Sequence, residues 1–93
     1  MSVENLEPHS DDSIQVRCIH DGALWALTAK VLEEPPTVVF VVAASWQQAI
    51  LEFRQSLAKV IDEADRCHEE FPIIAAKLTA LRWRHFEFVK VNV

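Results

Sequence analysis

The most constraining feature of this sequence is a run of apolar residues that recurs alternately after four and after three positions. Its members are Trp46, Ile50, Phe53, Leu57, Val60, Ala64, Cys67 and Phe71. This spacing is typical of one face of an amphipathic α-helix. Ser45 stands where a helix N-cap is expected, with Gln48 in the capping-box position, and Pro72 cannot continue a helix. The sequence therefore predicts one long helix over residues 45–70.

A β-hairpin is predicted ahead of this helix. Residues 14–20 alternate between apolar and polar side chains, and Asp21-Gly22 is a signal for a two-residue type I′ turn. Closing the chain on that turn would place His20 opposite Ala23. The remaining pairs of the hairpin then follow from this register.

A third strand is predicted directly before the long helix. Residues 38–44 are an uninterrupted apolar run rich in β-branched side chains, which is typical of a strand covered on both faces. Pro35 and Pro36 separate it from the hairpin by a turn. We therefore expect an antiparallel meander of three strands with the helix laid over one face.

The end of the chain indicates one more helix and one more strand. Pro72 suits the first turn of a helix over residues 72–81, and residues 83–91 are aromatic and β-branched. The predicted fold class is α+β: an antiparallel meander packed on one long amphipathic helix, then a short helix and a C-terminal strand. We expect a single domain over residues 14–93 and a flexible N-terminal arm over residues 1–13, because the arm has little to bury.

Composition limits the function classes. The net charge is −5 and only one glycine is present, which argues against general nucleic-acid binding and against a glycine-rich phosphate loop. No apolar run is long enough to span a membrane, and the polar start resembles no signal peptide, so we expect a cytoplasmic protein. Cys18 and Cys67 are expected to be free, buried thiols. We expect no cofactor.

The histidines are candidates for metal binding or for catalysis. Cys18 with His20 and Cys67 with His68 match no zinc-binding spacing, so no metal site is predicted. His20 beside Asp21 could act as a general base, but no nucleophile with an oxyanion loop accompanies the pair. We therefore expect a protein that is not an enzyme.

Two charged segments are candidate binding surfaces. The acidic cluster consists of Asp62, Glu63, Asp65, Glu69 and Glu70. It is either a solvated helix face or a surface complementary to a basic partner. The basic-aromatic strip runs from Arg82 through Arg84 to Lys90 and can contact nucleic acid. The alternative, which we favour, is a core strand in which Trp83 and the phenylalanines are buried.

A length comparison predicts self-association. A helix over residues 45–70 spans about 38 Å, while strands of six or seven residues span about 20 to 24 Å. The distal half, residues 60–71, must then pack on the second helix or on another subunit. Strand alternation further places an apolar set on the sheet face away from the helix, namely Ile19, Leu24, Ala26, Val39 and Val41. We therefore predict a homodimer held through the distal helix and this second face.

The order of these elements resembles the HicB-like antitoxin fold and its single-domain relatives. Three segments carry the resemblance: IQVRCIH with the Asp21-Gly22 turn, LWAL at 24–27, and SWQQAILEF at 45–53. The family's Pro-Gly-Cys segment before the third strand is replaced here by Glu-Glu-Pro-Pro at 33–36. The resemblance implies a non-catalytic partner that neutralises a small toxin by protein contact.

The leading hypothesis is a small, non-enzymatic interaction protein of the antitoxin, immunity or phage-inhibitor type. It would act by occluding a surface of its partner, and the acidic cluster would be its binding residues. The alternative is a nucleic-acid-associated protein that uses Arg82, Arg84 and Lys90. A small enzyme with a site at His20 and Asp21 is the third possibility.

Overall fold

The structure, a computed structural model, describes residues 13–91. Its elements are β1 (Ser13–Asp21), β2 (Leu24–Leu32), β3 (Thr37–Ala43), α2 (Trp46–Arg66), α3 (Pro72–Thr79), the 3-10 helix η1 (Ala80–Trp83) and β4 (His85–Val91). The α+β prediction is confirmed, with three antiparallel strands, a long helix, a short helix and a C-terminal strand in the expected order. The expected arm lies outside the described residues, except that Ser13 already belongs to β1.

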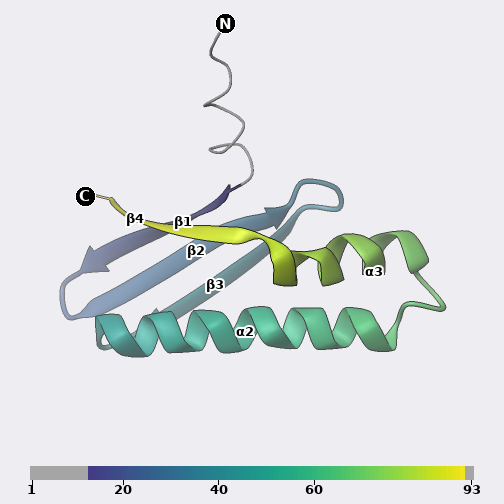
Figure 1. Ribbon diagram of the computed structural model, residues 1–93. Coiled ribbons are helices and arrows are strands. Elements are labelled where there is room, and N and C mark those ends of the chain that lie inside the picture. The colour runs from purple at the N-terminus through teal and green to yellow at the C-terminus, as the bar shows by residue number, and fades with distance from the viewer. Residues whose placement is uncertain (1–12, 92–93) are drawn as a thin grey trace, which may run out of the picture.

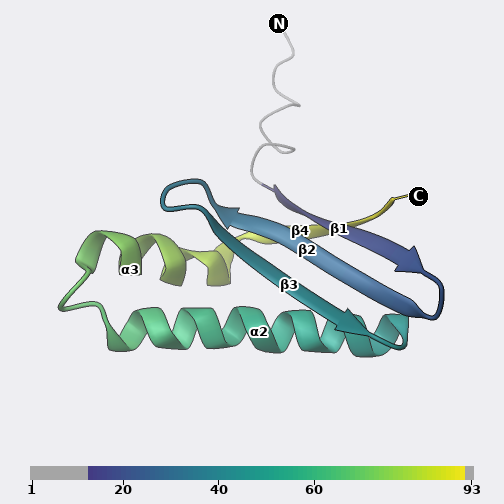
Figure 2. The same ribbon diagram turned by 180° about the vertical axis from the view of Figure 1, so that it is seen from behind.

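The four strands form one mixed sheet in the order β3-β2-β1-β4. The first three strands are antiparallel neighbours, whereas β4 lies beside β1 and runs parallel to it. Figures 1 and 2 show α2 lying across one face of the sheet, with α3 turning back beside the distal half of α2. The opposite face of the sheet has no helix over it among the described residues.

The hairpin turn differs from the prediction. Asp21 pairs with Leu24 and His20 with Trp25, so the register is shifted by two residues. Gly22 has φ +62°, but no other residue described has a positive φ. A type I′ turn needs positive φ at both central positions, which costs free energy for Ala23, whereas type II′ needs it only at the first. Because the shift is by two, the residues on each face are unchanged.

The core lies between the sheet and the two helices. Its members alternate along the strands and recur along α2: Ile14, Val16, Cys18, Leu27, Ala29, Val31, Val39, Val41, Ala43, Ala49, Phe53, Ile61 and Leu81. Phe53 is buried at the centre, where its ring makes edge-to-face contacts with Phe86 at 6.1 Å and Phe88 at 5.7 Å between centroids. These contacts tie α2 to the edge strand β4.

The long helix begins as predicted and ends earlier. The Ser45 Oγ accepts a hydrogen bond from the Gln48 N–H at 3.1 Å, which caps α2. The helix ends at Arg66, not at residue 70, because residues 67–71 form the turn that reverses the chain into α3.

The difference in length between helix and strands, on which the dimer prediction rested, is smaller in the structure. The 21 residues of α2 span about 32 Å, and the nine-residue strands β1 and β2 span about 30 Å. In addition, α3 packs on the distal half of α2, where Ala64 and Ala75 are both buried. The distal helix therefore needs less cover from a second subunit than the sequence indicated.

One face assignment in the sequence analysis was wrong. Val39 and Val41 are buried beneath α2, and the residues between them face away from the helix. The outer face therefore exposes Val38, Phe40 and Val42 instead, together with Leu24. The continuous apolar run gave no alternation from which the face could be read.

Candidate partner-binding surfaces

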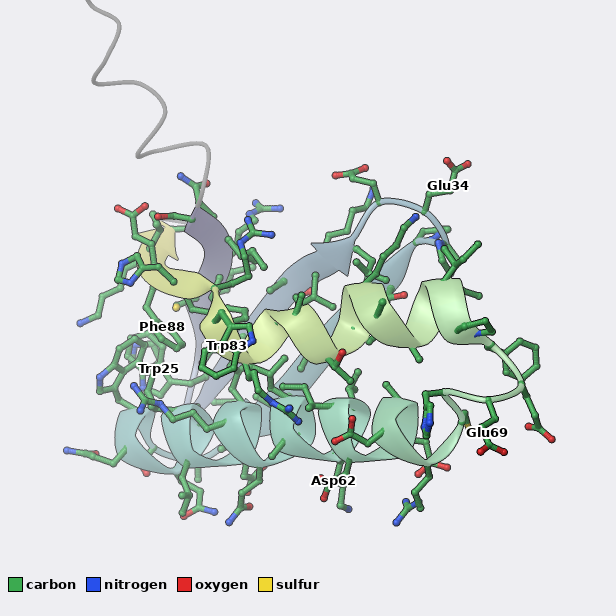
Figure 3. The ribbon with its side chains drawn as sticks, turned by 45° about the vertical axis from the view of Figure 1, so that its right-hand side comes forward. Trp25, Glu34, Asp62, Glu69, Trp83 and Phe88 are labelled. Carbon is green, nitrogen blue, oxygen red and sulfur yellow. The ribbon has the colours of Figure 1, made fainter. Side chains whose placement is uncertain are left out.

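The five residues of the acidic cluster do not form one surface. Glu63 forms an ion pair with Arg66 on the helix itself. Asp65 lies toward η1, where its carboxylate accepts a hydrogen bond from Arg82 at 3.1 Å. Figure 3 shows Asp62 on the side of α2 away from the sheet, and Glu69 in the turn between α2 and α3. Together with Glu70, Glu69 lies in that exposed turn.

An apolar groove lies next to this turn, between α2 and α3. It has a volume of about 400 Å³ and is lined by Val60, Glu63, Ala64, Cys67, Phe71, Ile74, Ala75 and Leu78. Two small, buried side chains line it, Ala64 on α2 and Ala75 on α3. Glu63 is the one carboxylate in its wall.

The rim of the groove is unusually apolar for an exposed surface. Of the residues that line the groove, Phe71 is 56% exposed and Ile74 is also exposed. Single exposed apolar residues are ordinary, but a contiguous group beside a groove marks an interaction site. Three acids, Glu63, Glu69 and Glu70, lie on the groove or at the turn that closes it. We call the groove, together with Phe71, Ile74 and these three acids, the acid-rimmed groove.

The basic-aromatic strip is not a core strand throughout. Trp83 ends η1 and is 82% exposed, so the preference for a buried Trp83 was wrong. Phe86 and Phe88 face α2, as expected of a core strand, but they are half-buried and not buried. The chain changes from helix to strand at Arg84, and this change turns Trp83 away from the core.

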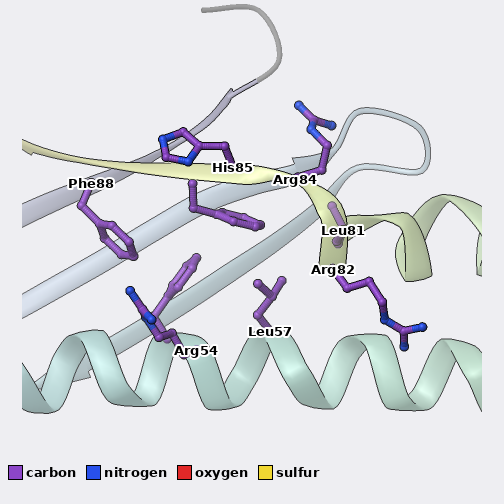
Figure 4. Close-up of a pocket in the computed structure, with 9 residues that line it drawn as sticks. Arg54, Leu57, Leu81, Arg82, Arg84, His85 and Phe88 are labelled. Atoms are coloured by element: carbon purple, nitrogen blue, oxygen red, sulfur yellow. The ribbon is translucent and has the colours of Figure 1, made fainter. Parts of the chain in front are cut away.

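A second pocket, of about 370 Å³, separates this strip from α2. Its floor is aromatic and aliphatic, and its basic side chains are Arg54, Arg82, Arg84 and His85. Figure 4 shows that these groups diverge: Arg84 and His85 point away from α2, whereas Arg82 descends toward it. The basic side chains therefore surround the pocket without converging on one point inside it.

Lys90 lies apart from the two arginines of the strip. Its Nζ is 4.8 Å from the centre of the Trp46 ring and 5.6 Å from that of Trp25, within the range of a cation–π contact. The Trp25 ring also stacks on His20 with 4.2 Å between centroids. Lys90 thus contacts both Trp46, at the start of α2, and Trp25, on β2, whereas His20 contacts Trp25.

Both cysteines are free, and the prediction that both are buried is wrong for Cys67. Cys18 is fully buried, and this burial raises the pKa of its thiol above 9.0, although the Val89 backbone and the Lys90 charge oppose the rise. Cys67 is only half-buried and lines the acid-rimmed groove. Among residues 13–91, no three His, Cys, Asp or Glu side chains are grouped so that they could hold a metal ion.

No protein-family model, curated protein or solved structure matches this chain. Within residues 13–91, none of the helices has the length and apolar character needed to cross a membrane.

Sequence reasoning found the acids but missed the groove. The groove depends on how closely α3 returns along α2, and the short α3 has apolar residues on several sides, including Ile73 and Ile74. A one-sided pattern would have indicated which of them face solvent. The available signal was that four of the first five residues of α3 are apolar. One face of a helix packed on the core cannot cover all four, so some of them must be exposed.

Proposed function

We propose that this chain is a small, non-enzymatic interaction protein that inhibits or neutralises a partner protein by occluding part of its surface. The observation that carries the proposal is the acid-rimmed groove, in which exposed Phe71 and Ile74 line an apolar cavity with Glu63 in its wall. An antitoxin, an immunity protein and a phage inhibitor would all act in this way.

The chemistry of the groove defines the partner segment. Apolar side chains at helical spacing would fill the cavity, as amphipathic helices do in other grooves. Each apolar side chain removed from water contributes about 1.5 to 3 kcal/mol before the cost of association. Lysine or arginine on the flanks of that segment would face Glu69 and Glu70, which favours rapid association and the correct orientation. The proposed partner is therefore a basic, amphipathic helix.

A synthetic peptide tests this chemistry directly. The probe is an amphipathic helical peptide with Leu on one face and Lys on the other, and its twin carries Glu in place of Lys. We expect the Lys peptide to bind, to bind more weakly as salt is raised, and to shift the NMR signals of Val60, Ile74 and Leu78. The Glu twin is expected not to bind, because its charges repel the rim.

Two matched variants locate the effect. Glu69→Lys with Glu70→Lys should weaken Lys-peptide binding about tenfold or more, since each lost favourable charge contact is worth about 1 kcal/mol. Glu33→Lys with Glu34→Lys makes the same charge change in the exposed turn before β3 and should leave binding nearly unaltered by comparison. Equal binding of both peptides, or shifts confined to the outer sheet face, would refute the proposal.

A second candidate function is nucleic-acid association through the basic-aromatic strip. The observation in its favour is Trp83, whose exposed ring stands beside Arg82 and Arg84 and is available for stacking on a base. Single-stranded RNA should then give a salt-dependent gel shift that is lost in Trp83→Ala and in Arg82→Ala with Arg84→Ala. A gel shift that persists in Trp83→Ala would exclude base stacking on Trp83 as part of this candidate function.

The homodimer remains part of the proposal. Because α3 packs on the distal helix, we place the dimer contact on the outer sheet face, where Phe40 is 61% exposed between Val38 and Val42. Sedimentation equilibrium over about 1 to 100 micromolar measures the association, which is concentration-dependent by mass action. A single species at the 10.6 kDa chain mass throughout that range would contradict a dimer.

A further inference from the structure

The free edge of β3 lacks the usual protection of an edge strand. Within the described residues, β3 pairs with β2 alone, so the backbone N–H and C=O groups along its other side have no strand partner. Natural edge strands are usually blunted by charges, prolines or bulges. No charged residue occurs anywhere from Pro35 to Trp46. The opposite edge of the sheet, β4, carries both Glu87 and Lys90.

The sequence of β3 is also a palindrome. Residues 38–42 read Val-Val-Phe-Val-Val in both directions, with Phe40 at the centre. An antiparallel pair of identical strands related by a two-fold axis at Phe40 places Val38 opposite Val42 of the partner subunit. Every side chain would then face one of its own kind. Such cross-strand pairs of aromatic and β-branched residues stabilise antiparallel sheets.

We propose that β3 pairs with β3 of a second copy, antiparallel and about a two-fold axis at Phe40, so that the two sheets become one continuous sheet. The inference rests on the homodimer proposed above and adds its strand and its register. On the outer face, Phe40 would lie against Phe40 of the partner subunit, with the exposed Val38 and Val42 on either side. On the inner face, the already buried Val39 and Val41 would continue the core across the junction.

This arrangement closes at two subunits. A two-fold contact uses the same edge of each copy, so it leaves no second β3 edge for a third chain. Among the described strands, the edges left are the two β4 strands, which carry charge of both signs at Glu87 and Lys90. Their charges make continued edge-to-edge growth unfavourable.

Engineered thiols test the register in a Cys67→Ser background, in which the one native thiol left is the buried Cys18. Directly opposed residues on antiparallel strands have Cα atoms about 4.5 to 5.5 Å apart, within the range that a disulfide spans. Mild oxidation of Phe40→Cys should therefore give a disulfide-linked dimer in most of the protein. The same treatment of Val38→Cys should not, because the two copies of position 38 would lie four residues, about 13 Å, apart.

The double variant Val38→Cys with Val42→Cys completes the set and should form the dimer again, since those positions face each other across the axis. Val38→Cys is the matched control, because Val38 is exposed on the same strand face as Phe40. Cross-linking of Val38→Cys alone, at the rate of Phe40→Cys, would overturn the proposed register.

Sedimentation equilibrium of the unmodified protein separates the two proposals. A dimer that fails to cross-link through position 40 overturns β3 pairing and leaves the homodimer intact. A monomer throughout the concentration range overturns both. Neither result affects the acid-rimmed groove, because the peptide assay reports on α2 and α3 and not on β3.

Discussion

Replacing Phe53 with alanine tests the packing of α2 on the sheet. Phe53 is 1% exposed and is the largest fully buried side chain in the core. Its removal deletes the contacts with Phe86 and Phe88 and leaves a cavity between α2 and β4. Truncations of this kind cost about 3 to 5 kcal/mol, a large part of the total stability of a small domain, which is about 5 to 15 kcal/mol.

Urea denaturation followed by circular dichroism measures the change. With a slope near 1 kcal/mol per molar for a chain of this size, the midpoint of Phe53→Ala should fall by about 3 molar or more. If that variant is unfolded without urea, Phe53→Leu provides a milder step of about 1 to 3 kcal/mol. Gln55→Ala is the control, because Gln55 is exposed on the same helix. A midpoint for Phe53→Ala no lower than that of Gln55→Ala would refute the assignment of this helix face.

Four further outcomes are expected. Leu57→Ala should cost about 2 kcal/mol, the low end of the range for core leucines, since Leu57 is only half-buried. Its urea midpoint should lie between those of Phe53→Ala and Gln55→Ala. Ser45→Ala removes the α2 cap and should cost about 1 kcal/mol, whereas Ser56→Ala, inside the helix, should cost less in the same assay. A thiol reagent should modify Cys67 in the native protein and Cys18 only after unfolding. Because the folded-state pKa of Cys18 is raised, its contribution to stability is complete below about pH 9. That contribution should decline as the pH rises further through the folded-state pKa. Urea midpoints measured over that pH range should therefore fall.

The sequence predicted the elements whose patterns have one clear period. The repeat from Trp46 identified α2 and its cap, and the alternation around Cys18 identified β1 and its buried face. The order of elements, and so the fold class, followed from these patterns and from the prolines that separate them.

The parts that could not be predicted depend on contacts between distant segments. The pairing of β4 with β1 is parallel and spans most of the chain, so no local pattern encodes it. The face of β3 was misassigned because five consecutive apolar residues at 38–42 have no period. The exposure of Trp83 results from the switch between η1 and β4, and its aromatic ring alone favoured the core.

The candidate site was predicted in part. The acids of distal α2 were identified from charge alone, but their separation depends on where Arg66 and Arg82 lie. The apolar half of the groove needed the return of α3 along α2, which only the three-dimensional structure supplies.

The most direct test of the interaction proposal compares the proteins captured from a lysate of the source organism by three immobilised baits. The baits are the wild-type chain, Phe71→Ser in the wall of the groove, and Leu24→Ser on the outer sheet face; both substituted side chains are exposed, so the fold should be retained. The account predicts a protein with a basic amphipathic segment that the wild type and Leu24→Ser retain and Phe71→Ser loses. Capture of the same proteins by all three baits would contradict it.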